Sequence, residues 1–155
     1  MAVATRRGEQ VTGHIETTTR AYRWLLWSSA IYVVGLVSHT ADHVRRGISV
    51  LTGPVLGAGT LSTIAGIVIV WLIVARNRKA PFLAAIFGPT TAIGVVIVHV
   101  PPHWGVFSDP FIGSTGTGVT AFSWIVVFLE VAGLLAMGIS GIAVLREQSM
   151  EVLAR

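Results

Sequence analysis

Four long apolar runs dominate this sequence, and each is long enough to cross a lipid bilayer as an α-helix. A helix rises about 1.5 Å per residue, so a hydrocarbon core about 30 Å thick takes about 20 apolar residues. Only helices and closed barrels satisfy every backbone hydrogen bond inside a bilayer. The sequence therefore predicts an all-α integral membrane protein, a bundle of four transmembrane helices. The predicted spans are about 24–44, 56–75, 81–100 and 121–145.

Composition leaves little material for any other domain. Of the 155 residues, 53% are hydrophobic and only 12% are charged, whereas a soluble domain has about 25% charged residues. We expect one transmembrane domain, residues 21–148, between a polar tail of residues 1–20 and a short tail of residues 149–155. The first tail lacks the apolar core of a signal peptide. Because the sequence has no cysteine, disulfides and thiolate metal ligands are excluded.

The basic residues predict how the chain is oriented. Nine of the 11 Lys and Arg residues lie in the N-terminal tail, the loop after the second run or the C-terminal end. Only Arg45 and Arg46 lie in the other two loops. By the positive-inside rule, both termini are cytoplasmic and the loops 45–55 and 101–120 face outward. Basic clusters beside apolar runs indicate topology and not a nucleic-acid surface, so we expect a multi-pass protein of the cell membrane.

Small residues recur at four-residue spacing in the third and fourth runs. Such stripes allow neighbouring helices to approach closely, so we expect them to form helix-packing seams. Seams of this kind also fit a homo-oligomer or a larger membrane complex as partner. The two stripes are Ala84, Gly88 and Ala92, and Ala132, Ala136 and Ser140.

Four of the five histidines lie near the outward ends of the first and third runs. In the sequence SHTADHV, His39, Asp42 and His43 have the spacing i, i+3 and i+4, so they project from one face of a helix. His99 and His103 lie at the end of the third run. Because both runs point outward, the two histidine pairs reach the same depth in the bilayer. The sequence therefore predicts a cluster of imidazoles between these two helices.

Two carboxylates accompany the histidines. Glu130 is the only acidic residue inside the fourth run, roughly 13 Å below the outer surface by helical rise. A carboxylate facing lipid costs several kcal/mol, so we expect Glu130 to face the interior as a metal ligand or general base. Asp42 is expected to bind the metal or to orient a ligating histidine. Alternatively, it pairs with Arg45 or Arg46 one turn away.

Imidazole and carboxylate ligands without sulfur suit a transition metal such as zinc, iron or copper. The sequence thus favours an outward-facing metal site between the first, third and fourth helices, in a membrane metalloenzyme or a metal-handling protein. An enzyme would act on a lipid or another apolar molecule that arrives laterally, and the Gly/Thr-rich loop 108–120 would be its lid. Six residues make up the predicted ligand set: His39, His43, His99, His103, Asp42 and Glu130.

Two other functions fit the same residues. The first is a b-type haem in an electron-transfer subunit, with His43 and His99 as axial ligands and Gly35 and Gly94 making room for the macrocycle. The second is a non-catalytic accessory subunit that docks a larger membrane complex through its small-residue stripes. On these residues alone, an enzyme, an electron carrier and an accessory subunit all remain open.

Overall fold

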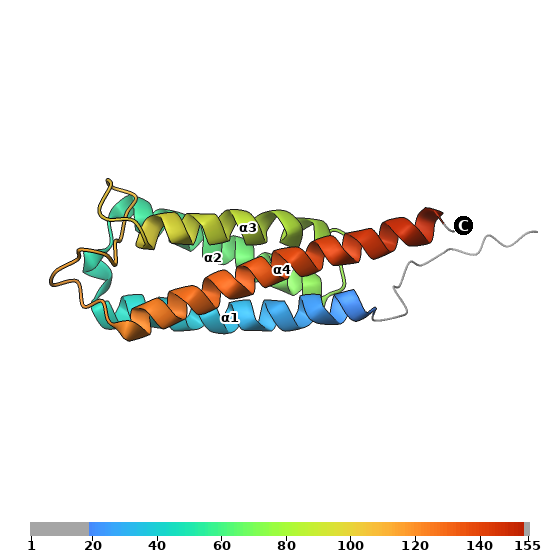
Figure 1. Cartoon of the computed structure of the whole chain (residues 1–155), viewed down its shortest axis with the longest axis horizontal. Helices are drawn as coiled ribbons and strands as arrows, with labels where there is room; N and C mark the ends of the chain where they lie inside the picture. Colours follow the sequence, from blue (N-terminus) through green and yellow to red (C-terminus); the bar gives the residue numbers. More distant parts are fainter. Residues whose placement is uncertain (1–18, 154–155) are drawn as a thin grey trace, which may run out of the picture.

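The computed structural model describes residues 19–153, and most of the tail predicted at 1–20 lies outside them. Within the described residues the chain forms four long α-helices, each long and apolar enough to cross a membrane (Figure 1). The predicted all-α class and the prediction of four long apolar helices are therefore confirmed. The elements are α1 (Arg20–Arg46), the short 3-10 helix η1 (Ile48–Val50), α2 (Gly53–Val74), α3 (Ala80–His99) and α4 (Ala121–Leu153).

Local sequence explains where the first two helices begin and end. The side chains of Thr19 and Thr52 each accept a hydrogen bond from a backbone N–H in the first turn of α1 and α2, respectively. Pro54 lies in the first turn of α2, where its missing N–H costs nothing. Gly47 follows α1 with a φ of 92°, a conformation that favours glycine and stops the helix.

The fourth helix is longer than its apolar run. It continues to Leu153, past the predicted end at 145 and through most of the segment 149–155. The apolar pattern ends at Arg146, but the following residues are mostly good helix formers, so backbone hydrogen bonding continues. At about 1.5 Å per residue, its 33 residues span about 50 Å, well beyond a hydrocarbon core of about 30 Å.

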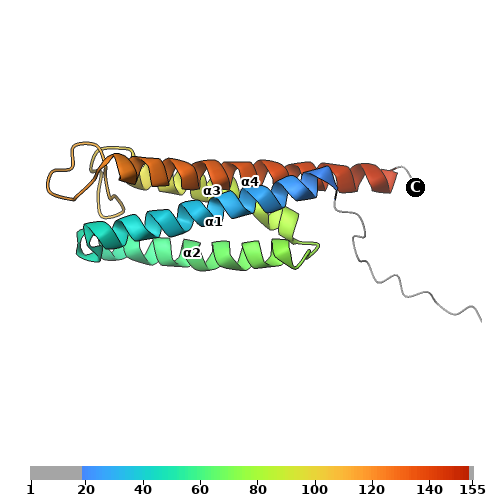
Figure 2. The same cartoon turned by 90° about the horizontal axis from the view of Figure 1, so that it is seen from below.

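The helices form a bundle in which α1 and α3 run one way and α2 and α4 run the other (Figure 1). The fourth helix packs closely against both α1 and α3. The second helix lies on the side of α1 and α3 that is opposite α4, and it packs loosely against both (Figure 2). We call one end of the bundle the histidine end; there α1 and α3 finish, α2 and α4 begin, and the loop 100–120 lies.

Glycine allows α4 to approach its neighbours closely. A Cβ atom on Gly35 of α1 would lie 2.5 Å from the Cα of Glu130, and one on Gly133 would lie 2.6 Å from the backbone of Tyr32. Real Cβ atoms are not found this close to backbone, so only glycine fits. The apolar core follows these contacts and includes Leu25, Tyr32, Ala84, Leu134 and Met137, all buried.

The two predicted small-residue stripes differ in outcome. In α3 the stripe is buried, as predicted: Ala84, Gly88 and Ala92 all face the bundle interior. In α4 the stripe does not line the bundle interior, because Ala132 is exposed and Gly133, one residue further, is buried instead; contact of this stripe with a partner stays a prediction. One residue is about 100° around a helix, so an error of a single position turns a stripe away from its seam.

Candidate metal centre

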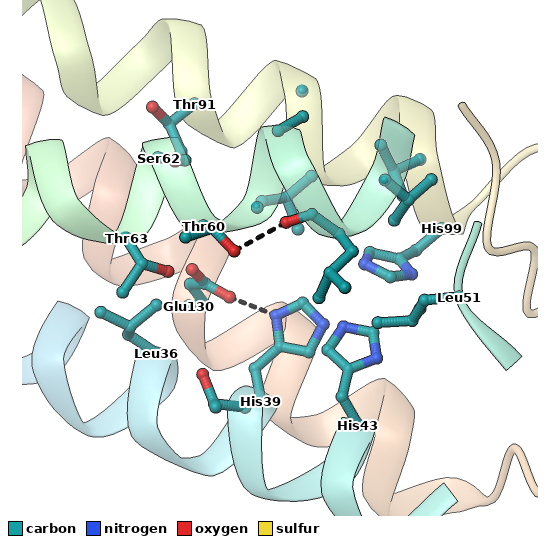
Figure 3. A pocket seen from close by; sticks show the side chains of 18 of the residues that line it. Leu36, His39, His43, Leu51, Thr60, Ser62, Thr63, Thr91, His99 and Glu130 are labelled. Atoms are coloured by element: carbon teal, nitrogen blue, oxygen red, sulfur yellow. Dashed lines mark hydrogen bonds and ion pairs between the residues drawn. The ribbon is translucent and has the colours of Figure 1, made fainter. Parts of the chain in front are cut away.

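Three imidazoles meet at the histidine end of the bundle. His39 and His43 project from the last two turns of α1, and His99 projects from the last turn of α3 (Figure 3). The centroids of the three rings are 4.6, 4.8 and 5.5 Å apart. One nitrogen of each ring lies within 4.8 Å of the other two, close enough for the group to hold a metal ion. The structure therefore brings together three of the six predicted ligands.

Glu130 reaches the group from α4. Its carboxylate forms a hydrogen bond with Nδ1 of His39 (Figure 3), and both side chains are buried. Gly35 makes this contact possible, because it lets the backbone of Glu130 lie against α1 one turn before His39. A carboxylate accepts the Nδ1–H hydrogen, which leaves the lone pair of His39 on Nε2. That Nε2 atom is buried and has no hydrogen-bond partner among the described residues.

His99 is held in the same tautomer by the loop. Its Nδ1 lies 3.0 Å from the backbone carbonyl oxygen of Asp109. A carbonyl oxygen can only accept, so Nδ1 carries the proton and Nε2 keeps the lone pair. Histidines that bind metals usually donate their other ring N–H to a carbonyl or carboxylate in this way. His43 is less constrained, since its buried Nδ1 has no hydrogen-bond partner among the described residues and lies 3.7 Å from Oδ2 of Asp109.

Asp109 anchors the loop 100–120 at the histidine end through Arg46. The guanidinium of Arg46 donates two hydrogen bonds to the Asp109 carboxylate, at 2.8 and 2.6 Å, and its side chain is fully buried. Burial alone would raise the pKa of Asp109, but three interactions of its carboxylate outweigh it: the approach of Nδ1 of His99, 3.4 Å from Oδ2, the hydrogen bonds from Arg46, and the charge of Arg46. The pKa of Asp109 therefore lies well below its ordinary range, and the carboxylate is ionised.

The same part of the loop covers His99. The ring of Phe111 lies 4.8 Å from the His99 ring, centroid to centroid, and the guanidinium of Arg46 lies 5.3 Å from the Phe111 centroid. The backbone N–H groups of Asp109 and Phe111 donate to the carbonyl oxygens of Val98 and His99, which lack helical partners at the end of α3. These contacts fix residues 109–111 over the imidazoles. They lie in the segment 108–120 predicted as a lid, and opening of that lid stays a prediction.

Two predicted ligands lie outside the imidazole group. Asp42 is fully buried, and its Oδ1 accepts two hydrogen bonds from Arg45, at 2.8 and 3.0 Å. Arg45 also donates to the carbonyl oxygen of Gly118 and to the Ser123 hydroxyl, so it ties α1 to the loop and to α4. Of the three roles considered for Asp42, the structure shows the ion pair with Arg45. His103 is exposed on the loop after α3.

The sequence analysis missed Asp109 and Phe111. Asp109 is the only acidic residue in the loop 101–120, and that side of the bundle has two arginines in its loops. This charge pairing was a usable signal for Asp109. Phe111 offered no comparable signal, because an aromatic residue in a loop near a membrane interface is common.

A cavity of about 580 Å³ opens beside the imidazoles, between α1, α2 and α3 (Figure 3). His39, His43, His99 and Glu130 all line it. Most of the remaining wall is apolar. The cavity lies where α2 packs only loosely against α1 and α3.

Comparison with known proteins adds no identification. No family model, no curated protein and no solved structure matches this chain. The function is therefore argued from the arrangement of these side chains and the cavity beside them.

Proposed function

We propose that this chain is a membrane metalloenzyme that binds one transition-metal ion through His39, His43 and His99. The observation that carries the proposal is a pair of buried ring nitrogens, Nε2 of His39 and Nδ1 of His43, without a hydrogen-bond partner among the described residues. A buried polar atom left unpaired costs about 1–3 kcal/mol. A metal ion bound by the imidazoles would offset this cost for both nitrogen atoms at once.

The ligand set favours a reactive centre over a structural one. Structural zinc sites have four protein ligands, while catalytic sites have three and keep one position open. Here three imidazoles form the group, and all three line the cavity, where a further ligand of the ion would have room. An ion held by these residues would supply the chemistry of activating water or polarising a carbonyl group at neutral pH. The ligand nitrogens are up to 4.8 Å apart, so with bonds of about 2.0–2.1 Å the rings would move inward on binding.

Glu130 has a supporting role in this proposal. Its hydrogen bond to Nδ1 of His39 fixes the ring orientation and makes Nε2 more basic, which is the usual function of a carboxylate behind a metal-binding histidine. Its negative charge also balances part of the charge of a divalent ion. In the absence of a metal, the same carboxylate stays paired with His39 and is not left alone in the bilayer.

We place the histidine end on the outer side of the cell membrane. The positive-inside rule supports this orientation, since nine of the 11 basic residues lie elsewhere. Arg45 and Arg46, the two exceptions, are paired with Asp42 and Asp109. Because both arginines form ion pairs that stabilise the fold, their position on the outer side does not argue against this orientation.

Packing at the site favours a bare ion over haem. A macrocycle ligated by His43 and His99 would have to pass between their rings, which are 5.5 Å apart, with the His39 ring packed against both. Gly35, one of the two glycines expected to make room, is covered by the backbone of Glu130. A purified protein with no Soret band would agree with this reasoning.

Elemental analysis of the protein purified in mild detergent tests the proposal. After incubation with Zn²⁺ and removal of unbound ion, we expect about one Zn²⁺ per chain for the native protein. His39→Ala and His99→Ala should each lose most of it. His103→Ala is the matched control and should retain the metal, because this histidine is exposed and lies outside the group.

Two results would overturn the proposal. One is a native protein that holds no stoichiometric zinc, iron, copper or nickel under these conditions. The other is metal retained equally by the native protein and by both alanine variants. Either result would favour a non-catalytic accessory subunit.

A further inference from the structure

A second, smaller cavity adjoins the one beside the imidazoles. It lies between α1 and α2 and has a volume of about 370 Å³. Leu36, Thr40 and Thr63 line both cavities, so the two meet at these residues. Val37 and Ile67 line the smaller one and are exposed on the surface that would face lipid. The smaller cavity therefore lies between the lipid-facing surface of α1 and α2 and the cavity beside the imidazoles.

The wall of the larger cavity is suited to a hydrocarbon chain. Two of the five threonines in this wall have their hydroxyls paired within their own helices, because Thr60 and Thr90 donate to the carbonyl oxygens of Leu56 and Ile86, each at 2.8 Å. The methyl groups of such threonines remain available to a ligand. The volume of about 580 Å³ also falls within the range of about 300–1,000 Å³ typical of sites for one small molecule.

The cavity also has a direction. It extends from Leu51, at the histidine end, to Thr63 and Thr91, which lie about two to three helical turns deeper by sequence. The imidazoles are close to its outer end. A lipid of the outer leaflet has the same polarity, with its polar group near the surface and its chain toward the bilayer centre.

Resting on the metal site proposed above, we propose that this cavity binds a single-chain amphiphile with an anionic oxygen head group, a long-chain carboxylate. The carboxylate would occupy the open position at the ion, where one Glu130 charge does not fully balance a divalent cation. The chain would lie against the apolar wall and would enter between α1 and α2. Since lipid tails are as apolar as this wall, the chain acts mainly by concentrating the ligand in the bilayer.

Cobalt provides a readout of this binding that does not depend on activity. Protein in lipid nanodiscs is loaded with Co²⁺, whose visible absorption changes when a ligand occupies the open position. Sodium dodecanoate and sodium acetate are then titrated in parallel. Each CH₂ group contributes about 0.8 kcal/mol to partition from water, or about fourfold. We therefore expect dodecanoate to act at a total concentration at least about 100-fold below that of acetate.

Three glycine variants separate use of the cavity from simple partition. A Cβ atom on Gly59 or Gly94 would meet no atom within 4 Å, and both residues line the cavity, so Gly59→Leu and Gly94→Leu fill it without a clash. They should raise the dodecanoate concentration required about tenfold or more and leave the acetate response unchanged. Gly57→Leu is the control, since Gly57 has the same open surroundings on α2 but does not line the cavity.

The outcomes distinguish this inference from the function on which it rests. If Co²⁺ fails to bind to the native protein, the metal site and the inference both fall. If Co²⁺ binds but the filled variants respond to dodecanoate as Gly57→Leu does, only the inference falls. A diacyl phospholipid in the nanodisc that itself shifts the Co²⁺ spectrum, before any dodecanoate is added, would overturn the assignment to a single-chain ligand.

Discussion

Glycine has opposite uses on the two sides of this bundle. Where α4 meets α1, Gly35 and Gly133 allow backbone to touch backbone, and no other residue fits. On the α2 side, Gly59 and Gly94 have nothing within 4 Å of where a side chain would begin. The first pair creates a close seam and the second pair leaves space. The same residue type in the sequence therefore marks both a closely packed part and an open part of the molecule.

The group of three imidazoles lies where these two sides meet. Glu130 and His39 come from the close seam between α4 and α1, which fixes their positions. The open side contributes the cavity in front of them. A functional site requires side chains held within fractions of an ångström and also room for a ligand. Here the two requirements are met by different helices, and this division leads to four predictions.

The largest effect should come from filling the close seam. In Gly133→Leu the new side chain would begin 2.6 Å from the α1 backbone, which cannot move aside cheaply. We expect a loss of about 3 kcal/mol or more in the free energy of unfolding, at the upper end of the cost of overpacking. Thermal unfolding in detergent, followed by circular dichroism, measures it. A variant as stable as Gly94→Leu would show that the two sides do not differ.

The loop at the histidine end should contribute to stability as the close seam does, because Asp109 ties it to α1. Asp109→Asn removes the charge that accepts two hydrogen bonds from the buried Arg46. We expect a loss of about 1.5–3 kcal/mol, typical of hydrogen bonds to charged groups. Urea or thermal unfolding of the metal-free protein checks this, with the exposed Glu151→Gln as control. If the unfolding free energy is unchanged, the Arg46–Asp109 pair does not stabilise the fold, and the loop resembles the loosely packed α2 side instead.

Glu130→Gln tests whether the seam supports the metal or only the fold. Glutamine keeps the shape and one hydrogen-bonding oxygen but loses the charge that orients and polarises His39. Changes to such supporting residues typically weaken metal affinity 10- to 100-fold. Competition for Zn²⁺ with a chromophoric chelator measures the affinity. If affinity is unchanged, the carboxylate has no part in holding the metal.

The smallest effect should come from the open side. Gly57→Leu adds a side chain where nothing lies within 4 Å, on a helix that packs loosely. We expect a change of no more than about 0.5 kcal/mol in unfolding free energy and no change in metal content. The same unfolding and elemental measurements apply. A large destabilisation would mean that another surface covers this face of α2.

The spans of this fold were predictable because each is a continuous apolar run of the right length. The first three helices begin and end within a few residues of their predicted limits. Continuous apolarity does not reveal which side of a helix faces its neighbours, however. The α4 stripe was therefore placed on Ala132 when the seam uses Gly133. For the same reason, the loose position of α2 and the cavity that results were not predictable.

The site divides in the same way. The convergence of His39, His43 and His99 followed from their spacing and from the parallel direction of two helices. The role of Asp109 depends on how a long loop folds back over the helix ends, and loop paths are not encoded in periodicity. Asp42 lies on the same face of the helix as His39 and His43, as its spacing predicts, but its carboxylate forms an ion pair with Arg45.

The length of α4 makes the sidedness of the molecule easy to measure. Its last turns continue as a regular α-helix past the apolar residues, to Leu153. An epitope or a fluorescent label joined there would stand clear of the lipid head groups on the side away from the imidazoles. Protease or antibody applied from either face of sealed vesicles would then report which compartment each end of the protein occupies.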